Sequence, residues 1–118
     1  MTPSLAEVQA LLPLPPATFH ILVAISPEPL HGYAIIQDVA ARTHGALRLS
    51  AGTLYRSIAR MVEQGLIAET TRRRTLDDER RRYYRITPFG TAVARAEMKR
   101  LTDLVRLARA SGLTPESA

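Results

Sequence analysis

The stretch with the most informative chemistry is S-A-G-T-L-Y-R-S-I-A-R-M-V-E-Q-G, residues Ser50 to Gly65. Read as a helix, it has one apolar face and one face of hydroxyl, amide and guanidinium groups without an acid. Ser50 is suited to cap its start and Gly65 to end it. Arginine can pair with guanine edges, and short polar side chains can reach bases or phosphates, so the polar face is typical of a DNA recognition helix. The apolar face consists of Leu54, Ile58, Met61 and Val62, and the polar face of Thr53, Arg56, Ser57, Arg60 and Gln64.

Each polar side chain of this helix also has a plainer interpretation. Without DNA contact, Arg56, Ser57 and Arg60 would be a solvated helix face. Thr53 would either touch a base or phosphate, or help to cap the first turn. Tyr55 lies at the edge between the two faces, so its phenol would reach a phosphate while the ring packs, or the residue would only pack.

The net charge of +5 is concentrated in the middle of the chain. Residues Arg42 to Arg85 carry 11 arginines and five acids, a net charge of +6, whereas the remainder has a net charge of −1. Positive charge confined to one segment favours a surface that faces a polyanion. The alternative is an arginine-rich, solvated surface, since arginines outnumber lysines 15 to 1.

Three helices are expected before the recognition helix: a short amphipathic helix over Ser4–Leu12, a buried central helix over Thr18–Ile25, and a helix from Leu30 to about His44. Residues 46–49 can hold only a very short strand. A helix, a short break and a second amphipathic helix together predict a helix-turn-helix. The third helix is expected to face the core with Tyr33, Ile36, Val39 and Ala40, and to be capped by Gly45.

After Gly65 the hydrophobic period changes from 3.6 to 2, which predicts strands over Leu66–Arg73 and Arg80–Thr87. Tyr84 and Ile86 share the face expected to meet the core. The predicted fold is therefore mainly α with a small β-hairpin wing, a winged helix-turn-helix. For the wing arginines the alternative to DNA contact is solvation, and for Tyr33 it is core packing. The residues expected to meet the DNA backbone are His31, Gly32, Tyr33, Arg72, Arg73, Arg74 and Arg81.

A long last helix is expected from Thr87, its N-cap, to about Ser111. Its apolar residues alternate at spacings of four and three, as in a coiled-coil seam, and Val93, Leu104 and Leu107 widen the stripe. We therefore expect a twofold homodimer in which the N-terminal helix of one subunit packs against the last helix of the other. The residues assigned to this interface are Leu5, Val8, Leu12, Ala94, Met98, Leu101, Leu104, Val105 and Ala108.

The 118 residues divide into an N-terminal helical arm (1–15), a winged helix-turn-helix domain (16–87), a C-terminal dimerisation helix (88–112) and a tail (113–118). Because the chain has no cysteine, thiolate metal sites and disulfides are excluded, which suits a cytoplasmic protein. The longest apolar run is too short to cross a membrane, and no export signal is expected. Neither the histidines nor the hydroxyl residues have partners at metal-binding or catalytic spacing, so we expect no metal, no cofactor and no enzymatic activity.

Four motifs follow one another along the chain: His31-Gly32-Tyr33; Ser50-Ala-Gly-Thr-Leu-Tyr55 with Ile58, Arg60 and Met61; Glu63-Gln-Gly-Leu-Ile67; and Arg82-Tyr-Tyr-Arg-Ile-Thr-Pro-Phe-Gly90. In this order and spacing they resemble the PadR family of bacterial transcriptional regulators, over roughly residues 18–110. The chain length is similar to the short subfamily, which has one C-terminal dimerisation helix. The resemblance implies a dimeric repressor that binds a pseudo-palindromic operator in double-stranded DNA. It also implies release by a small hydrophobic or aromatic effector, such as a phenolic acid or a drug, near the dimer interface.

The sequence departs from the family pattern at three points. Arg56 stands where the family often has proline, and the acidic run Asp77-Asp78-Glu79 at the wing tip would be repelled by phosphate unless it pairs with neighbouring arginines. The chain has no tryptophan, between which drug-binding members can stack ligands, so no particular ligand carries over. Two rival functions stay open: a winged helix whose basic face docks an acidic protein, and a small-molecule sensor without specific DNA binding.

Overall fold

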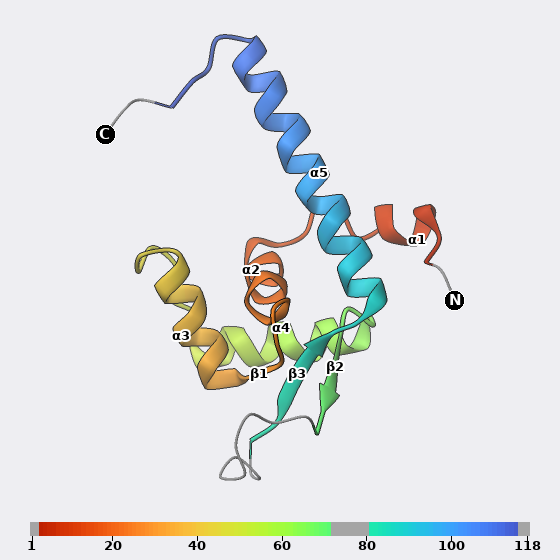
Figure 1. Cartoon of the computed structure of the whole chain (residues 1–118), viewed down its shortest axis with the longest axis vertical. Helices are drawn as coiled ribbons and strands as arrows, with labels where there is room; N and C mark the ends of the chain where they lie inside the picture. The colour runs from red at the N-terminus through yellow and green to blue at the C-terminus, as the bar shows by residue number, and fades with distance from the viewer. Residues whose placement is uncertain (1–2, 72–80, 116–118) are drawn as a thin grey trace.

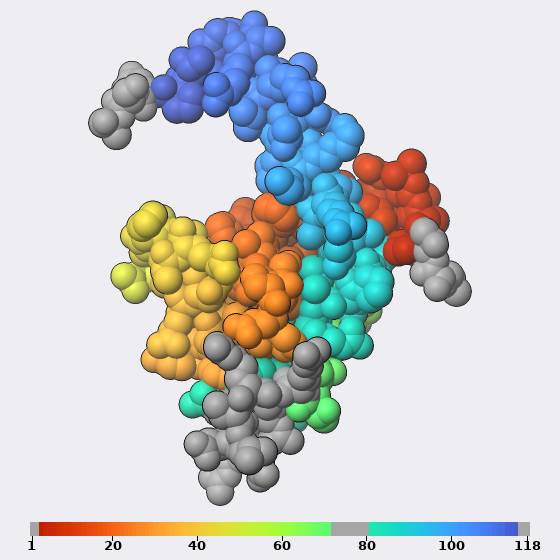
Figure 2. Space-filling model, in the orientation of Figure 1, coloured from red at the N-terminus to blue at the C-terminus, as the bar shows by residue number. Residues whose placement is uncertain are grey.

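The computed structural model describes residues 3–71 and 81–115, and its architecture is mainly helical with a small antiparallel sheet (Figure 1). The fold predicted from the sequence is therefore confirmed. The long last helix leaves the rest of the molecule, and its C-terminal half stands clear of the other elements (Figures 1 and 2). In chain order the elements are α1 (Leu5–Gln9), α2 (Pro16–Ile25), β1 (Leu30–His31), α3 (Gly32–Arg42), α4 (Ala51–Glu63), β2 (Ile67–Thr70), β3 (Tyr83–Ile86) and α5 (Pro88–Ala110).

Helix α2 is the centre of the molecule, as its apolar composition predicts. Ile21, Leu22 and Ile25 are fully buried, and the helix packs against α3, α4, α5 and β3. It starts at Pro16, two residues earlier than expected, because proline is well suited to the first helical position. Burial is not complete all round, since Val23 is 38% exposed. The other helices are thus arranged around one side of α2.

The recognition helix α4 follows the prediction closely. The Ser50 hydroxyl accepts from the backbone N–H of Thr53 at 3.1 Å, and Gly65 has a φ of 78° just past the helix end. The expected apolar stripe is buried at Leu54 and Ile58, but Val62 is 43% exposed. Val62 lies at the margin of the stripe, about 80° from Leu54 at 100° per residue, where the core no longer covers it.

Helix α3 starts later than predicted, and its expected core face is present at Val39 and Ile36 but not at Tyr33. Leu30 and His31 form β1 instead of a first helical turn, and His31 becomes the N-cap, its Nδ1 accepting from the Ala34 N–H at 3.1 Å. The prediction that Tyr33 faces the core is wrong, because Tyr33 is 61% exposed and Ile35 is buried in its place. Residues two apart in a helix lie about 200° apart, so Tyr33 and Ile35 cannot share a face.

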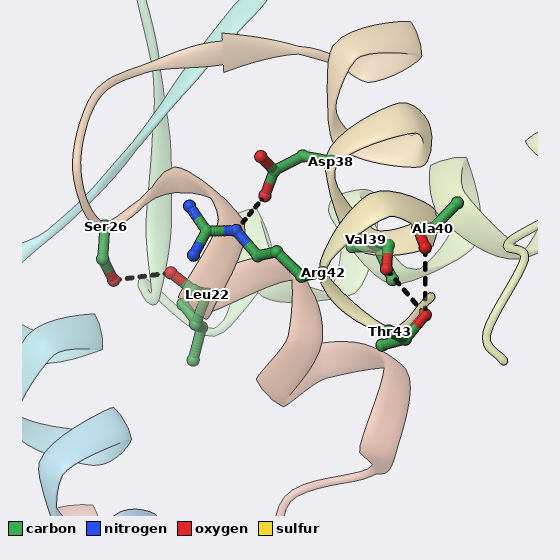
Figure 3. Close-up of polar contacts among 7 residues, drawn as sticks. All are labelled: Leu22, Ser26, Asp38, Val39, Ala40, Arg42 and Thr43. Atoms are coloured by element: carbon green, nitrogen blue, oxygen red, sulfur yellow. Dashed lines mark hydrogen bonds and ion pairs between the residues drawn. The ribbon is translucent and has the colours of Figure 1, made fainter. Parts of the chain in front are cut away.

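The turn between α3 and α4 is held by side-chain hydrogen bonds near the end of α3 (Figure 3). The Thr43 hydroxyl donates to the Val39 carbonyl at 2.8 Å and accepts from the Leu47 N–H at 3.0 Å. Gly45 has a φ of 81°, and its N–H reaches the Ala40 carbonyl at 2.7 Å. These contacts end α3 and fix the direction in which the chain enters α4.

The sheet has the order β1-β3-β2, with both pairs antiparallel. The extra short strand is therefore β1, and residues 46–49, where it was expected, form none. Tyr84 is buried in the core and Ile86 packs partly buried against it, as predicted. Tyr83, on the opposite face, is buried as well, because the His31 ring of β1 meets it edge to face at 5.3 Å between ring centroids.

Helix α5 begins as predicted, with the Thr87 hydroxyl accepting from the Gly90 N–H at 2.9 Å. Helix α1 is shorter than expected and packs against α5 of its own chain. Glu97 is buried on α5, where its carboxylate accepts from Arg100 at 2.6 and 2.9 Å. The Leu14 backbone N–H also donates to this carboxylate. These bonds, Arg100 foremost, lower the pKa of Glu97 below its usual value, so a charged group links the N-terminal arm to α5.

Candidate nucleic-acid interface

The polar face of α4 is open to solvent and carries the two predicted arginines. Arg56 and Arg60 are exposed and line a shallow hollow of about 640 Å³ together with Glu63 and Gln64. The prediction that this face carries no acid is wrong, because Glu63 lies on it, opposite Leu54. At 100° per residue, Glu63 lies about 180° around the helix from Leu54, so its place on the polar face could have been predicted from the sequence. The face is cationic at both arginines and has one carboxylate, Glu63, toward the C-terminal end of the helix.

Several side chains at the start of α4 form hydrogen bonds with residues close to them in the sequence. Besides capping the helix, the Ser50 hydroxyl donates to Thr53 Oγ1 at 3.1 Å. The same Thr53 oxygen lies 3.5 Å from Nη2 of Arg56. Thr53 thus takes part in the cap, one of the two roles expected from the sequence, and it also contacts Arg56. Ser57 is half-buried beside them.

A pocket of about 330 Å³ joins groups that come from three parts of the chain. It lies where the start of α3, the first turns of α4 and the base of the wing meet. Tyr33 and Tyr55 are 61% and 54% exposed, so the phenols are open to a ligand. The structure therefore places the predicted backbone-contact residues of α3, the wing residue Arg81 and one residue of the recognition helix around a single hollow. Its lining residues are His31, Gly32, Tyr33, Tyr55, Arg81, Arg82 and Tyr84.

Gly32 makes this arrangement possible. A Cβ atom at this position would lie 2.6 Å from the Tyr55 Oη and 3.2 Å from a methyl group of Leu54. Any larger residue would push the Tyr55 side chain out of the pocket. Gly32 is thus a spacer that lets α3 and α4 approach.

The geometry of His31 gives the pocket its chemistry. Nδ1 accepts from the Ala34 N–H, and Nε2 lies 2.8 Å from Nη1 of Arg81. The role of Nε2 depends on the tautomer of the ring, whereas the guanidinium is always a donor. The Arg81 guanidinium thus lies at hydrogen-bond distance from the His31 ring at the mouth of the pocket. A DNA phosphate at this mouth would accept from the guanidinium.

The described part of the wing contains further ionisable groups. Arg82 lies 3.7 Å from Glu69 across the hairpin, and both side chains are more than half exposed. Burial raises the pKa of the Tyr84 phenol, and Glu69 raises it further, so Tyr84 is neutral at physiological pH. Arg72, Arg73, Arg74, Arg80 and the acidic run 77–79 lie outside the described residues.

Arg48 is a candidate that the sequence prediction missed. It lies exposed in the turn before α4, and its guanidinium is next to Gly45, whose added Cβ would be 3.0 Å from Nη2. A cation in the turn of a helix-turn-helix flanks the recognition helix. Arg48 stands two residues before the N-cap Ser50, and this position could have identified it as a candidate from the sequence.

The predicted interface residues fall into two groups. Met98, Leu104 and Val105 are 52–64% exposed on α5, and Leu5 is 74% exposed, whereas Leu101, Ala94 and Ala108 are half-buried. Val8 is buried in the core of its own chain and Leu12 packs partly against that core, and Val93 is fully buried there too. Next to the exposed stripe is an apolar groove of about 420 Å³, lined by Phe19, Val23, Ser26, Pro27, Ile86, Thr91, Ala94, Arg95 and Met98.

Among residues 3–71 and 81–115, no three histidine, cysteine or acidic side chains are grouped so that they could hold a metal ion. No helix in that part of the chain is both long and apolar enough to cross a membrane.

Helices α3 and α4 form a helix-turn-helix, a β-hairpin follows directly, and the exposed face of α4 is basic. This combination defines a winged-helix DNA-binding protein. The family model described as "Transcriptional regulator PadR-like family" matches residues 21–96 of the chain. The chain belongs to this family.

Individual relatives agree with this assignment. The "Transcriptional regulator Rv3488" of Mycobacterium tuberculosis is 34% identical over 87 residues, which cover 74% of this chain and 77% of the relative. A solved transcriptional regulator from Clostridium thermocellum is 22% identical with a TM-score of 0.67, and the match covers 91% of this chain and 95% of that one. A PadR family regulator from Eggerthella lenta is 25% identical with a TM-score of 0.66, over 94% and 89% of the two chains. The protein is thus a DNA-binding transcription regulator of this family.

Proposed function

We propose that this regulator is a homodimeric repressor that binds a pseudo-palindromic operator through α4 and the pocket at the start of α3. The observation that carries the proposal is the pocket itself, in which the Arg81 guanidinium meets the His31 ring near the exposed phenols of Tyr33 and Tyr55, beside the exposed face of α4. A phosphate held there would position α4 against the major groove. In a twofold dimer, the two recognition helices would meet half-sites about one DNA turn, roughly 34–36 Å, apart.

Within each protomer the side chains divide into two roles. The exposed side chains of α4 face the base edges or the phosphates that flank them. The pocket residues hold one phosphate, and the phenols of Tyr33 and Tyr55 add donors to it. The α4 residues proposed to contact DNA are Thr53, Tyr55, Arg56, Ser57, Arg60 and Gln64, and those proposed at the backbone are His31, Tyr33 and Arg81, with Gly32 as spacer.

The exposed stripe of α5 supports the dimer. Met98, Leu104 and Val105 present contiguous apolar surface on a helix that extends beyond its own core (Figure 2). Apolar surface of this kind is characteristic of an interface, and a second α5 with the same stripe is a matching occupant. Because Val8 is already buried in its own chain, we propose α5 as the main contact and Leu5 as the exposed apolar residue of α1 that the partner covers.

The groove beside this stripe supports release by an effector. Phe19, Val23 and Met98 give it apolar walls, and Arg95 places one cation at the wall. A small hydrophobic or aromatic molecule would fit such a lining. Since the groove touches α2, β3 and α5, an occupant would alter how α5 sits on the DNA-binding domain, and thus the spacing of the two α4 helices.

The proposal is tested by fluorescence anisotropy of the full chain with DNA from upstream of its own gene and with a scrambled duplex. Both titrations are run at low and at near-physiological salt. Tighter binding to the upstream DNA that persists at the higher salt is the expected result. Equal, salt-sensitive binding to both duplexes would reduce the interface to a basic surface, and binding to neither would favour docking of an acidic protein.

A further inference from the structure

Arg56 occupies a defined place on the exposed face of α4. Its Nη2 lies 3.5 Å from Thr53 Oγ1, and its Nη1 would lie 3.3 Å from a Cβ atom added at Gly52. Both neighbours precede Arg56 in the helix, so the guanidinium points toward the start of α4. In a helix-turn-helix the first turns of the recognition helix are the part that meets base edges.

The oxygen that Arg56 contacts is itself held in place. The Thr53 N–H donates to the Ser50 hydroxyl at 3.1 Å, and that hydroxyl donates to Thr53 Oγ1 at 3.1 Å. The helix cap therefore fixes the side chain of Thr53, and Thr53 offers a fixed acceptor to Arg56. An arginine that is already positioned loses less rotamer freedom when it binds than a free one does.

Gly52 is an unusual choice at a helical position, because alanine is a much better helix former. The atom that an added methyl group would meet is Nη1 of Arg56. At 3.3 Å the contact is tight enough to displace the guanidinium by a few tenths of an ångström. The glycine thus leaves room for the Arg56 guanidinium at the cost of helix propensity.

We propose that Arg56 sets the base preference of the operator by donating two hydrogen bonds to O6 and N7 of a guanine. Thr53 and Gly52 are positioning residues for it. Arg60, one turn further along in the hollow with Glu63, serves the phosphates instead. The assignment rests on the proposed operator binding and adds which residue reads the sequence.

The test begins with selection of duplexes by the full-length protein from a random-sequence pool. The most enriched duplex, its single-base variants and a scrambled duplex are then compared by anisotropy. We expect one guanine per half-site to be strongly preferred, and Arg56→Ala to reduce that preference about tenfold or more. Arg56→Lys keeps the charge but not the rigid fork, so it should lose much of the preference and retain the affinity for the scrambled duplex.

Arg60→Ala is the matched control, since it removes the same charge one turn away. It should weaken binding to all duplexes in equal proportion and leave the guanine preference intact. If Arg60→Ala abolishes the guanine preference while Arg56→Ala retains it, the assignment is overturned. If the wild-type protein enriches no motif, the proposed operator binding itself fails, before any variant is compared.

The positioning roles have their own readout. Thr53→Val removes the acceptor and Gly52→Ala displaces the guanidinium, so both should lower the guanine preference severalfold, and by more than they lower affinity for the scrambled duplex. Thr53→Ser should restore it, and Gly52→Ala should raise the melting temperature through better helix propensity. A uniform loss of affinity in Gly52→Ala would show that the glycine makes room for DNA, which would overturn its role toward Arg56.

Discussion

His31 combines two tasks in one side chain. Its Nδ1 caps α3, and its Nε2 lies 2.8 Å from Nη1 of Arg81 at the mouth of the pocket. The cap needs Nδ1 without a proton, because a proton there would remove the acceptor for Ala34. The same residue thus joins the start of α3 to the base of the wing.

Replacement of His31 should separate these tasks. His31→Asn keeps a good N-cap but lacks Nε2, which contacts Arg81 at the mouth of the pocket. DNA affinity should therefore fall about tenfold, which corresponds to the roughly 1.5 kcal/mol of a hydrogen bond to a charged group. His31→Ala should lose the same affinity and about 1 kcal/mol of additional stability through the missing cap. Anisotropy and thermal unfolding of both variants test this. Equal stability of the two variants would show that the cap is unimportant, and unchanged affinity would remove His31 from the interface.

Arg60 allows a second test at the same scale. Each phosphate contact contributes about 0.9 to the slope of log affinity against log salt concentration, so Arg60→Ala should reduce that slope by about 0.9 per protomer. Titrations of the selected duplex at several salt concentrations measure the slope. Gln64→Ala serves as the control, because it removes a polar group of the same hollow without removing charge. A loss of affinity at unchanged slope would instead make Arg60 a reader of bases.

At the scale of elements, what the sequence predicts well is what local signals determine. Ser50, Gly65 and Thr87 mark helix ends through bonds to residues close in the chain, and the structure has all three as expected. The prediction that Tyr33 faces the core was wrong because the start of α3 depends on β1. This strand forms only where Tyr83, some 50 residues away, provides a partner strand. No local pattern around Leu30 contains that information.

Glu97 shows the same limit for a charged residue. An acid on a helix with basic neighbours is normally read as exposed, yet Glu97 is buried because Leu14, from the arm, and Arg100 satisfy its carboxylate together. Its place was predictable only from knowing that the arm returns to α5. The arginine and hydroxyl side chains on the outer face of α4 were predictable from the helical period alone, but the contact between Thr53 and Arg56 was not.

The buried carboxylate leads to a prediction about pH. The pKa of Glu97 is lowered in the folded protein, so its contribution to stability is present above the ordinary pKa of 4.5 and is lost as the pH falls through the lower folded value. Glu97→Gln should cost about 1–2 kcal/mol at neutral pH, and the difference from wild type should shrink on acidification below about 4.5. Thermal unfolding from pH 7 to pH 3 measures the difference.

Asp103→Asn is the matched control on the same helix. Asp103 also pairs with a cation, Lys99 at 2.7 Å, but its side chain is 44% exposed, so its removal should change stability little at any pH. A Glu97→Gln variant that behaves like Asp103→Asn would show that the link between arm and α5 carries no stability. A constant difference between wild type and Glu97→Gln at every pH would point to altered packing instead of charge.

At the scale of the whole molecule, the outer half of α5 is the feature that one protomer does not explain. Met98, Leu104 and Val105 are exposed to water on this helix, so their apolar surface adds no stability unless another surface covers it. In the proposed dimer this stripe would set the spacing of the two α4 helices, so operator recognition would depend on a surface far from any base. Specificity at Arg56 and association along α5 would then be coupled, because a monomer would hold only one half-site.

Leu101→Asp should separate the subunits, because a charge placed in an apolar seam loses its hydration without gaining a partner. Leu101 is not part of the buried core of its own chain, so each protomer should keep its fold. Sedimentation equilibrium gives the mass, and circular dichroism checks the helices.

Thr102→Asp is the control. It adds the same charge to an exposed neighbouring position and should leave the dimer intact, particularly since Pro88–Ala110 carries five basic and two acidic residues. In the monomeric variant, affinity for a two-half-site operator should fall to that for a single half-site. A Leu101→Asp protein that sediments as a dimer would place the interface elsewhere, and the spacing of half-sites would then have to be set by another surface.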